Sequence, residues 1–206
     1  MKKIITLWLC LFITFTGAKA QSSAVKNVAK SVFTLTTFKQ DGSILASSRG
    51  IFVDNRGTAI STWTPFVGAA KAVVVDAKGN KQDVEELIGA NELYDVCKFR
   101  VKGNSVGAPL ATSSAAPESK IWLVGYSLKA PEIRSAIIKS KETFMQIYTY
   151  YILSTPAPDN ATGSPYVNQN GQVLGLLQHS TTNSDVYATD ARFINSFTLT
   201  GLSVND

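Results

Sequence analysis

The fold is decided by the stretch Arg49-Gly-Ile-Phe-Val-Asp-Asn-Arg-Gly-Thr-Ala-Ile-Ser-Thr62. Two short runs of mostly apolar and β-branched residues, 49–53 and 58–62, flank the segment 54–57, whose Asp-Asn-Arg-Gly composition is typical of a turn. Runs of this length are too short for an amphipathic helix and have the composition of strands. The stretch therefore predicts two neighbouring strands joined by a tight turn.

The same pattern of strand, turn and strand recurs along the chain. Residues 31–38 alternate in polarity and are followed by the hairpin signal Asp41-Gly42. Residues 95–101 place Cys97 and other apolar side chains on one face and basic side chains on the other, as in a half-buried strand. Further strands are expected at 72–76, 83–88, 121–126, 135–140, 143–153, 172–178 and 185–189, and a short helix or turn at 190–197. Many short strands with frequent turns predict an all-β sandwich or barrel.

A segment rich in Gly, Ser, Ala and Pro divides these strands into two groups. It covers about 103–120 and shows no hydrophobic periodicity. Two strand groups across a linker indicate two barrels, an N-terminal one at about 25–103 and a C-terminal one at about 121–197.

The first twenty residues have the features of a secretory signal peptide. Lys2 and Lys3 precede an apolar stretch, and Ala18-Lys19-Ala20 matches a small-x-small cleavage site. The apolar run is shorter than the approximately 20 residues that a membrane helix needs. We therefore expect residues 1–20 to be removed on export to a bacterial periplasm or the extracellular space, the alternative being an uncleaved N-terminal anchor.

Removal of the signal peptide changes the charge balance. The full chain has 20 basic and 15 acidic residues, and loss of three lysines leaves 17 against 15, a formal charge of +2. Such a small charge gives little support for a nucleic-acid partner, and no later segment is apolar enough to span a membrane. Cys97 alone then remains, so no intramolecular disulfide is possible, and it is expected to be a buried apolar residue. No metal-ligand cluster, P-loop or dinucleotide motif is present, so no cofactor or metal is expected.

Three segments, taken in chain order, resemble the trypsin-like serine proteases, most closely those of the HtrA/Deg type. The glycine-led hairpin 50–62, followed by Trp63-Thr64-Pro65, resembles the segment that carries the catalytic histidine. Residues 91–97, with Asp95 at the head of an apolar strand, resemble the aspartate segment. Residues 159–167, followed by 170–175, resemble the nucleophile loop and the hairpin after it. The resemblance covers roughly 25–197 and implies two six-stranded β-barrels of trypsin-like fold, with the three segments converging in one cleft.

The departures from the family pattern concern the catalytic residues themselves. The resemblance places Thr64 at the histidine position and Thr162 at the serine position, so that only Asp95 keeps its family identity. The family mechanism needs an imidazole that takes the proton of the nucleophile and passes it to the leaving amine, which a threonine hydroxyl cannot do near neutral pH. The three residues therefore mark a degenerate triad, and none is expected to be catalytic.

Two other features of the family site have counterparts here. By resemblance, Asn160 and Thr162 occupy the positions of the oxyanion-hole donors. Asn160 stands where the family usually has glycine, and asparagine is the residue that best tolerates a positive φ after glycine. By resemblance, the strand containing Gln178, His179 and Ser180 lines the peptide groove. His179 is the single histidine of the chain.

Three functions remain open from the sequence. The first is a monomeric, non-catalytic pseudoprotease that binds an extended peptide or protein by strand addition. The second is a hydrolase with a rearranged site that uses Thr162 as nucleophile and His179 as base. The third is a structural or envelope-interaction protein without a working groove.

Overall fold

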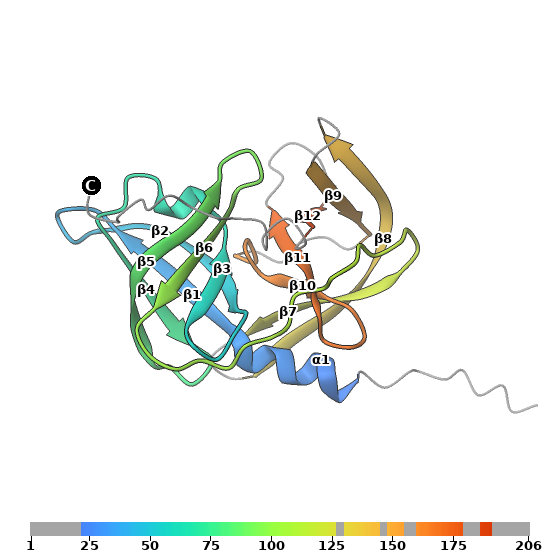
Figure 1. Ribbon diagram of the computed structural model, residues 1–206, viewed down its shortest axis with the longest axis horizontal. Helices are drawn as coiled ribbons and strands as arrows, with labels where there is room; N and C mark the ends of the chain where they lie inside the picture. The colour runs from blue at the N-terminus through green and yellow to red at the C-terminus, as the bar shows by residue number, and fades with distance from the viewer. Residues whose placement is uncertain (1–21, 127–129, 145–147, 155–159, 179–185, 191–206) are drawn as a thin grey trace, which may run out of the picture.

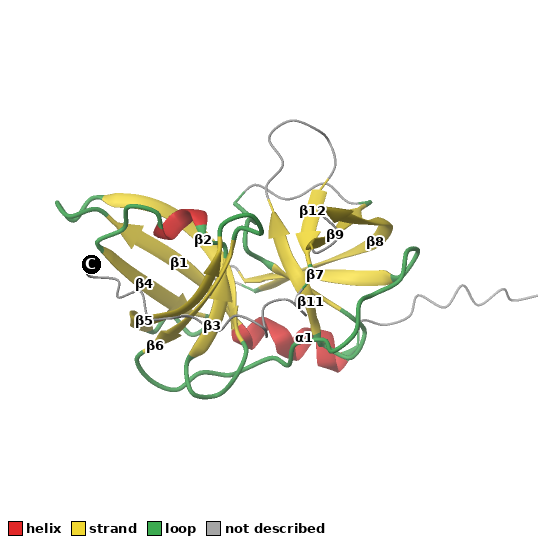
Figure 2. Cartoon of the chain, turned by 45° about the horizontal axis from the view of Figure 1, so that its top comes forward, coloured by secondary structure: helices red, strands yellow, loops and turns green. Residues whose placement is uncertain are grey.

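The computed structural model describes residues 22–126, 130–144, 148–154, 160–178 and 186–190. Within these residues the chain forms two β-barrels that lie side by side, as Figure 1 and the turned view in Figure 2 both show. The expected all-β architecture with two six-stranded barrels is therefore confirmed.

The N-terminal barrel closes in the order β1-β2-β3-β6-β5-β4, with β4 returning to β1. Its strands are β1 (Val32–Phe38), β2 (Ile44–Phe52), β3 (Thr58–Ser61), β4 (Lys71–Asp76), β5 (Lys81–Asn91) and β6 (Val96–Val101). All of its pairings are antiparallel. The turn predicted before β3 is held by Asp54, whose Oδ1 accepts the N–H groups of Arg56 at 2.8 Å and Thr58 at 3.0 Å.

The C-terminal barrel has the same strand order as the N-terminal barrel, with each strand number higher by six. It closes as β7-β8-β9-β12-β11-β10, with β10 returning to β7. Its strands are β7 (Lys120–Tyr126), β8 (Pro131–Phe144), β9 (Tyr148–Leu153), β10 (Pro165–Val167), β11 (Val173–Gln178) and β12 (Val186–Thr189). No strand occurs between β6 and β7, where the sequence predicted a linker.

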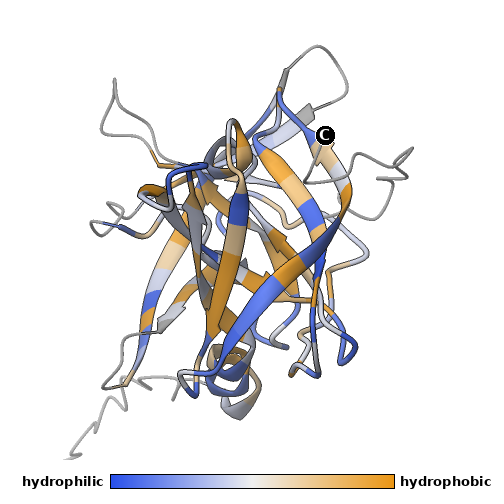
Figure 3. Ribbon diagram, turned by 90° about the vertical axis from the view of Figure 1, so that its left-hand side faces the viewer, coloured by the Kyte–Doolittle hydropathy of each residue, from blue (hydrophilic) through white to orange (hydrophobic). Residues whose placement is uncertain are grey.

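Alternation of side chains explains how each barrel fills its interior. Figure 3 shows apolar and polar residues alternating along the strands. In the N-terminal barrel the inward residues include Phe33, Phe52 and Phe99, all at most 2% exposed. The Phe33 ring lies 4.7 Å from that of Phe52 and 6.0 Å from that of Phe99, spacings at which aromatic pairs attract each other.

The C-terminal half differs in two places from what the sequence indicated. The single strand expected at 143–153 is split, because β8 ends at Phe144 and pairs with β9 from Tyr148 onward as an antiparallel hairpin. Strand β10 was not expected, because its three residues are too few to show alternation and its Pro165 is unusual in a strand. The helix or turn expected at 190–197 lies, apart from Asp190, outside the described residues.

A short helix that the sequence pattern did not indicate lies where the barrels meet. Helix α1 (Ser23–Val28) begins after Ser22, whose Oγ accepts the N–H of Val25 at 3.3 Å, and six residues are too few to show helical periodicity. Val25 and Val28 are buried in a core cluster that also contains residues of β1, β2, β7 and β11. The helix therefore closes the base of the interface between the barrels (Figures 1 and 2).

None of the described helices has the length and apolar character needed to cross a membrane.

Candidate functional site

Asp95 and Thr64 form a direct polar contact at the edge of the N-terminal barrel. Thr64 begins the 3-10 helix η2 (Thr64–Phe66) after β3, and Asp95 precedes β6 with a positive φ of 46°. The Oδ1 atom of Asp95 accepts the backbone N–H of Thr64 at 2.6 Å and its hydroxyl at 2.8 Å. Aspartate tolerates such a φ better than most residues, because its short side chain bonds locally to the backbone. The Thr64 hydroxyl is thus committed as a donor to the carboxylate.

Burial dominates the electrostatics of Asp95. Partial burial raises the pKa of this carboxyl, because removal from water disfavours its charged form. The hydrogen bonds from the backbone and side chain of Thr64, and a weaker one from the backbone of Trp63, oppose the rise without cancelling it. No Lys, Arg or His of the described residues forms an ion pair with Asp95.

The C-terminal barrel holds the loop that carries Asp95. The hydroxyl of Tyr94 donates to the carbonyl of Thr149, and the Tyr94 ring stacks on that of Tyr150 with centroids 4.8 Å apart. Gln178 Nε2 lies 3.3 Å from the carbonyl oxygens of both Tyr94 and Asp95. The position of Asp95 therefore depends on contacts between the two barrels.

Thr162 lies in a tight loop before β10. Asn160 has φ 58° and Gly163 has φ 82°, so the positive φ considered for Asn160 from the sequence is present. The N–H of Arg49 in β2 donates to the carbonyl of Thr162 at 2.8 Å, and the N–H of Gly163 donates to that of Leu177 at 2.9 Å. A Cβ atom at Gly163 would lie 2.0 Å from the carbonyl oxygen of Arg49, so only glycine permits this close approach.

Several donors of this loop have no partner among the residues that the structure describes. Within the described part of the chain, no acceptor takes the backbone N–H of Asn160 or of Thr162. The hydroxyl of Thr162, which is half-buried, likewise makes no hydrogen bond to a described residue. Free backbone N–H groups that flank a pocket are available to a carbonyl or carboxylate oxygen of a ligand.

One pocket, with a volume of about 460 Å³, brings these groups together. Its described lining is mostly small and polar: Ala46, Ser47, Ser48, Thr62, Thr64, Pro65, Asp95, Asn160, Thr162 and Gln178. The structure thus brings Thr64, Asp95 and Thr162, which the resemblance predicted as the triad positions, together with Asn160 around one pocket lined by both barrels. Asp95 is the one titratable side chain in the described lining.

Ser47, Ser48 and Thr62 were not predicted as site residues. Ser47 and Ser48 belong to β2, which reaches the pocket because Arg49 beside them pairs with the Thr162 loop. Thr62 is 1% exposed, and its Oγ1 has no hydrogen-bond partner among the described residues. The only sequence signal was a pair of small hydroxyl residues in a strand, which by itself indicates no site.

Of the three residues predicted for the peptide groove, the structure describes only Gln178. Gln178 lines the pocket, but its side-chain amide faces the loop of Asp95. His179 and Ser180 lie outside the described residues.

Cys97 lies behind the site and is fully buried. Its Sγ is 3.3 Å from the carbonyl oxygen of Thr62 and 3.6 Å from that of Ser61. Burial, reinforced by the nearby charge of Asp95, raises the pKa of this thiol well above its usual value. Cys97 is therefore an unreactive core residue and not a nucleophile.

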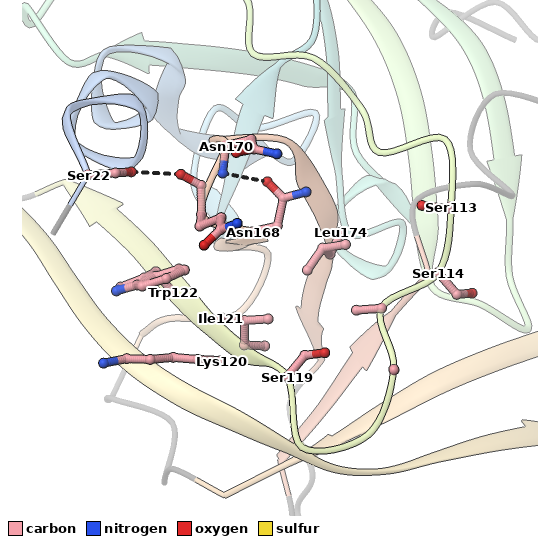
Figure 4. A pocket seen from close by; sticks show the side chains of 13 residues that line it. Ser22, Ser113, Ser114, Ser119, Lys120, Ile121, Trp122, Asn168, Asn170 and Leu174 are labelled. Carbon is pink, nitrogen blue, oxygen red and sulfur yellow. Dashed lines mark hydrogen bonds between the residues drawn. The ribbon is translucent and has the colours of Figure 1, made fainter. Parts of the chain in front are cut away.

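A second pocket, of about 560 Å³, lies on the C-terminal barrel away from the triad positions (Figure 4). Trp122 and Lys120 border it on one side and Ser113, Ser114 and Asn168 on others. Much of its polar lining already serves internal hydrogen bonds. Ser114 donates to Asp190 at 2.6 Å, and Asn168 Oδ1 accepts the N–H of Asn170 at 3.0 Å. These groups have less to offer a ligand than those of the Asp95 pocket.

In the part of the chain that the structure describes, no three His, Cys, Asp or Glu side chains gather closely enough to hold a metal ion.

The family model of the trypsin-like peptidase domain matches residues 48–176. This match spans more than half of the chain, runs from β2 into β11 and includes Thr64, Asp95 and Thr162. Together with the two closed barrels, it shows that the chain belongs to the trypsin-like peptidase domain family. A comparison with the curated proteins gave no match.

Proposed function

We propose that this protein is a pseudoprotease, a trypsin-like domain that binds extended peptides without cutting them. The observation that carries the proposal is the contact between Thr64 and Asp95. At the position where the family resemblance puts the catalytic histidine, a hydroxyl donates to the aspartate at 2.8 Å. The aspartate is thus occupied by a group that cannot carry a proton to or from a substrate near neutral pH.

The described lining of the pocket supplies Thr162 with no adjacent base to activate it. A threonine nucleophile needs an adjacent base, and the described lining offers Asp95 alone, which is already bonded to Thr64. Loss of triad members in such enzymes lowers turnover by roughly 10⁴- to 10⁶-fold, leaving about 10³- to 10⁴-fold over water. That remaining rate is too low for a working protease.

The groups that bind a peptide in such a groove are better preserved than those that cut it. The N–H groups of Asn160 and Thr162 have no acceptor among the described residues and can serve a peptide carbonyl. On the side of β10, the backbone of Leu177 in β11 is already bonded to the Thr162 loop, because its N–H donates to the carbonyl of Ser164 and its carbonyl accepts the N–H of Gly163, both at 2.9 Å. By the family resemblance, the segment of Gln178, His179 and Ser180 is the one to which an extended peptide adds by backbone hydrogen bonds.

Peptide binding can be tested by filling the pocket. Ser47 is exposed and lines it, so Ser47→Trp places an indole in the pocket without burying a large side chain in the core. Ser113→Trp is a matched control, because Ser113 is also exposed but lines the second pocket. We expect fluorescence anisotropy with a library of unstructured peptides to detect binding that Ser47→Trp abolishes and Ser113→Trp preserves.

The reverse pattern, or no binding by any peptide, would overturn the proposal and favour a structural role in the envelope. Incubation with unfolded casein tests the hydrolase alternative. Cleavage that disappears in Thr162→Ala and in His179→Ala would show a working, rearranged site.

We also propose that the domain is exported to the periplasm or the cell exterior and acts there as a monomer. The supporting observation is the N-terminal sequence, with Lys2 and Lys3, the apolar stretch and the Ala18-Lys19-Ala20 cleavage pattern. Mass spectrometry of the protein from an expressing bacterium should find Gln21 as the first residue.

A further inference from the structure

Asp95 is a charged group without a counter-ion in the described structure. It is half-buried, its described hydrogen-bond partners are the neutral Thr64 and Trp63, and no described Lys or Arg pairs with it. No other charged residue contributes to the described lining of its pocket. A partly buried carboxylate in this situation is stabilised when a cation reaches it. The pocket is therefore electrostatically suited to a positively charged group of the ligand.

Two further oxygen atoms in the lining can accept hydrogen bonds. Thr62 Oγ1 is buried and has no hydrogen-bond partner in the described part of the chain, although a buried hydroxyl normally has one. Thr64 Oγ1 gives its hydrogen to Asp95 and keeps its lone pairs. This side of the pocket thus offers a ligand hydrogen-bond acceptors from Asp95, Thr62 and Thr64. Among these described groups, the one unused donor is the hydroxyl of Thr62.

These acceptors match a primary ammonium better than a guanidinium. An ammonium group is compact and has three N–H donors and no acceptor. A guanidinium binds best as a planar fork that bridges both oxygens of a carboxylate. Oδ1 of Asp95 already accepts two hydrogen bonds from Thr64, so the fork would find only one free carboxylate oxygen.

We propose that the pocket recognises a peptide through a primary ammonium group, which binds at Asp95 beside Thr62 and Thr64. A backbone carbonyl of the same peptide accepts the N–H groups of Asn160 and Thr162 on the other side of the pocket. The inference rests on the proposed peptide binding and adds the chemistry that selects the peptide. The ammonium group is supplied by a lysine side chain or by a free peptide N-terminus.

The test compares peptides that differ only in this charge. The probes are an unstructured peptide with blocked ends and one lysine, the same peptide with that lysine acetylated, and a lysine-free peptide with a free N-terminus. Calorimetry should show that acetylation weakens binding by about fivefold, the upper end expected for an ion pair open to solvent. Stronger binding of the lysine peptide than of the free N-terminus would assign the lysine side chain as the source, and the opposite order the N-terminus.

Protein variants then locate the effect. Asp95→Asn keeps an oxygen for the bonds from Thr64 and tolerates the positive φ, so we expect it to fold and to bind the preferred cationic peptide and its neutral analogue equally. Thr62→Val should weaken binding of the cationic peptide alone. Asp83→Asn is the matched control, because Asp83 pairs with Lys71 at 3.0 Å and does not line the pocket.

Two results would overturn the inference. If acetylation or blocking of the amine leaves affinity unchanged, or if Asp95→Asn retains the full preference for the cationic peptide, Asp95 does not select the ligand. Binding that is still abolished by Ser47→Trp would in that case leave the proposed peptide binding intact. Absence of all peptide binding would instead remove both proposals.

Discussion

The contact between Thr64 and Asp95 makes a specific prediction for the variant Thr64→Val. Valine has nearly the shape of threonine and removes only the hydroxyl that donates to Oδ1 at 2.8 Å, leaving the backbone bond at 2.6 Å in place. A hydrogen bond to a charged group contributes about 1.5–3 kcal/mol to stability. Because Thr64 is exposed, solvent screening lowers this, and we expect a loss of about 1 kcal/mol when Asp95 is ionised.

The loss should depend on pH. Burial raises the pKa of Asp95 in the folded protein above its unfolded value, so this group stabilises the fold fully only at low pH, and the contribution disappears as pH rises through the folded pKa. Removal of the Thr64 hydroxyl takes away one interaction that favours the carboxylate, so the folded pKa rises further. Thr64→Val should therefore destabilise the protein more at about pH 8 than at about pH 4.

Urea unfolding followed by tryptophan fluorescence at the two pH values measures the difference. Thr36→Val is the control, because the Thr36 hydroxyl lies 3.4 Å from that of Ser47 and contacts no carboxylate. Its effect should be independent of pH. An equal loss at both pH values for Thr64→Val, or no loss at either, would refute the account of the contact as a donor to a charged carboxylate.

Three other predictions follow from single contacts. Gly163→Ala should lower the free energy of unfolding by more than about 3 kcal/mol, because the new Cβ would lie 2.0 Å from the Arg49 carbonyl oxygen. Gly42→Ala, at a similar φ of 81° but with nothing within 4 Å of the new Cβ, should lower it by only about 1 kcal/mol. Equal thermal stability of the two variants would contradict this. Gln178→Leu should lower the free energy of unfolding in urea by about 1 kcal/mol, because it removes the hydrogen bonds that join β11 to the loop before β6. Unchanged stability would show that these 3.3 Å contacts contribute nothing. The Cys97 thiol should resist an aromatic disulfide reagent in the native protein and react in denaturant, because it is buried and its pKa is raised; rapid reaction of the folded protein would place it at the surface.

Much of the barrel structure could be predicted because it is encoded locally. Alternation at 31–38 and 95–101 and the turn at 54–57 depend on neighbouring residues, and the structure has strands β1 and β6 and the Asp54 turn there. The burial of Cys97 followed from the same alternation. The expectations failed where segments were short, as for α1 and β10, because six or three residues do not show a period.

The candidate site depended on the tertiary structure to a greater degree. The sequence by itself determined that position 64 holds a threonine, whose hydroxyl cannot act as a base near neutral pH. Only the folded chain showed that the Thr64 hydroxyl bonds Asp95, that Ser47 and Ser48 of β2 border the same pocket, and that Thr62 has an unpartnered hydroxyl there. The physical reason is that these contacts join segments far apart in the chain. Their meeting is set by barrel closure and by the core shared between the barrels, and no local pattern records it.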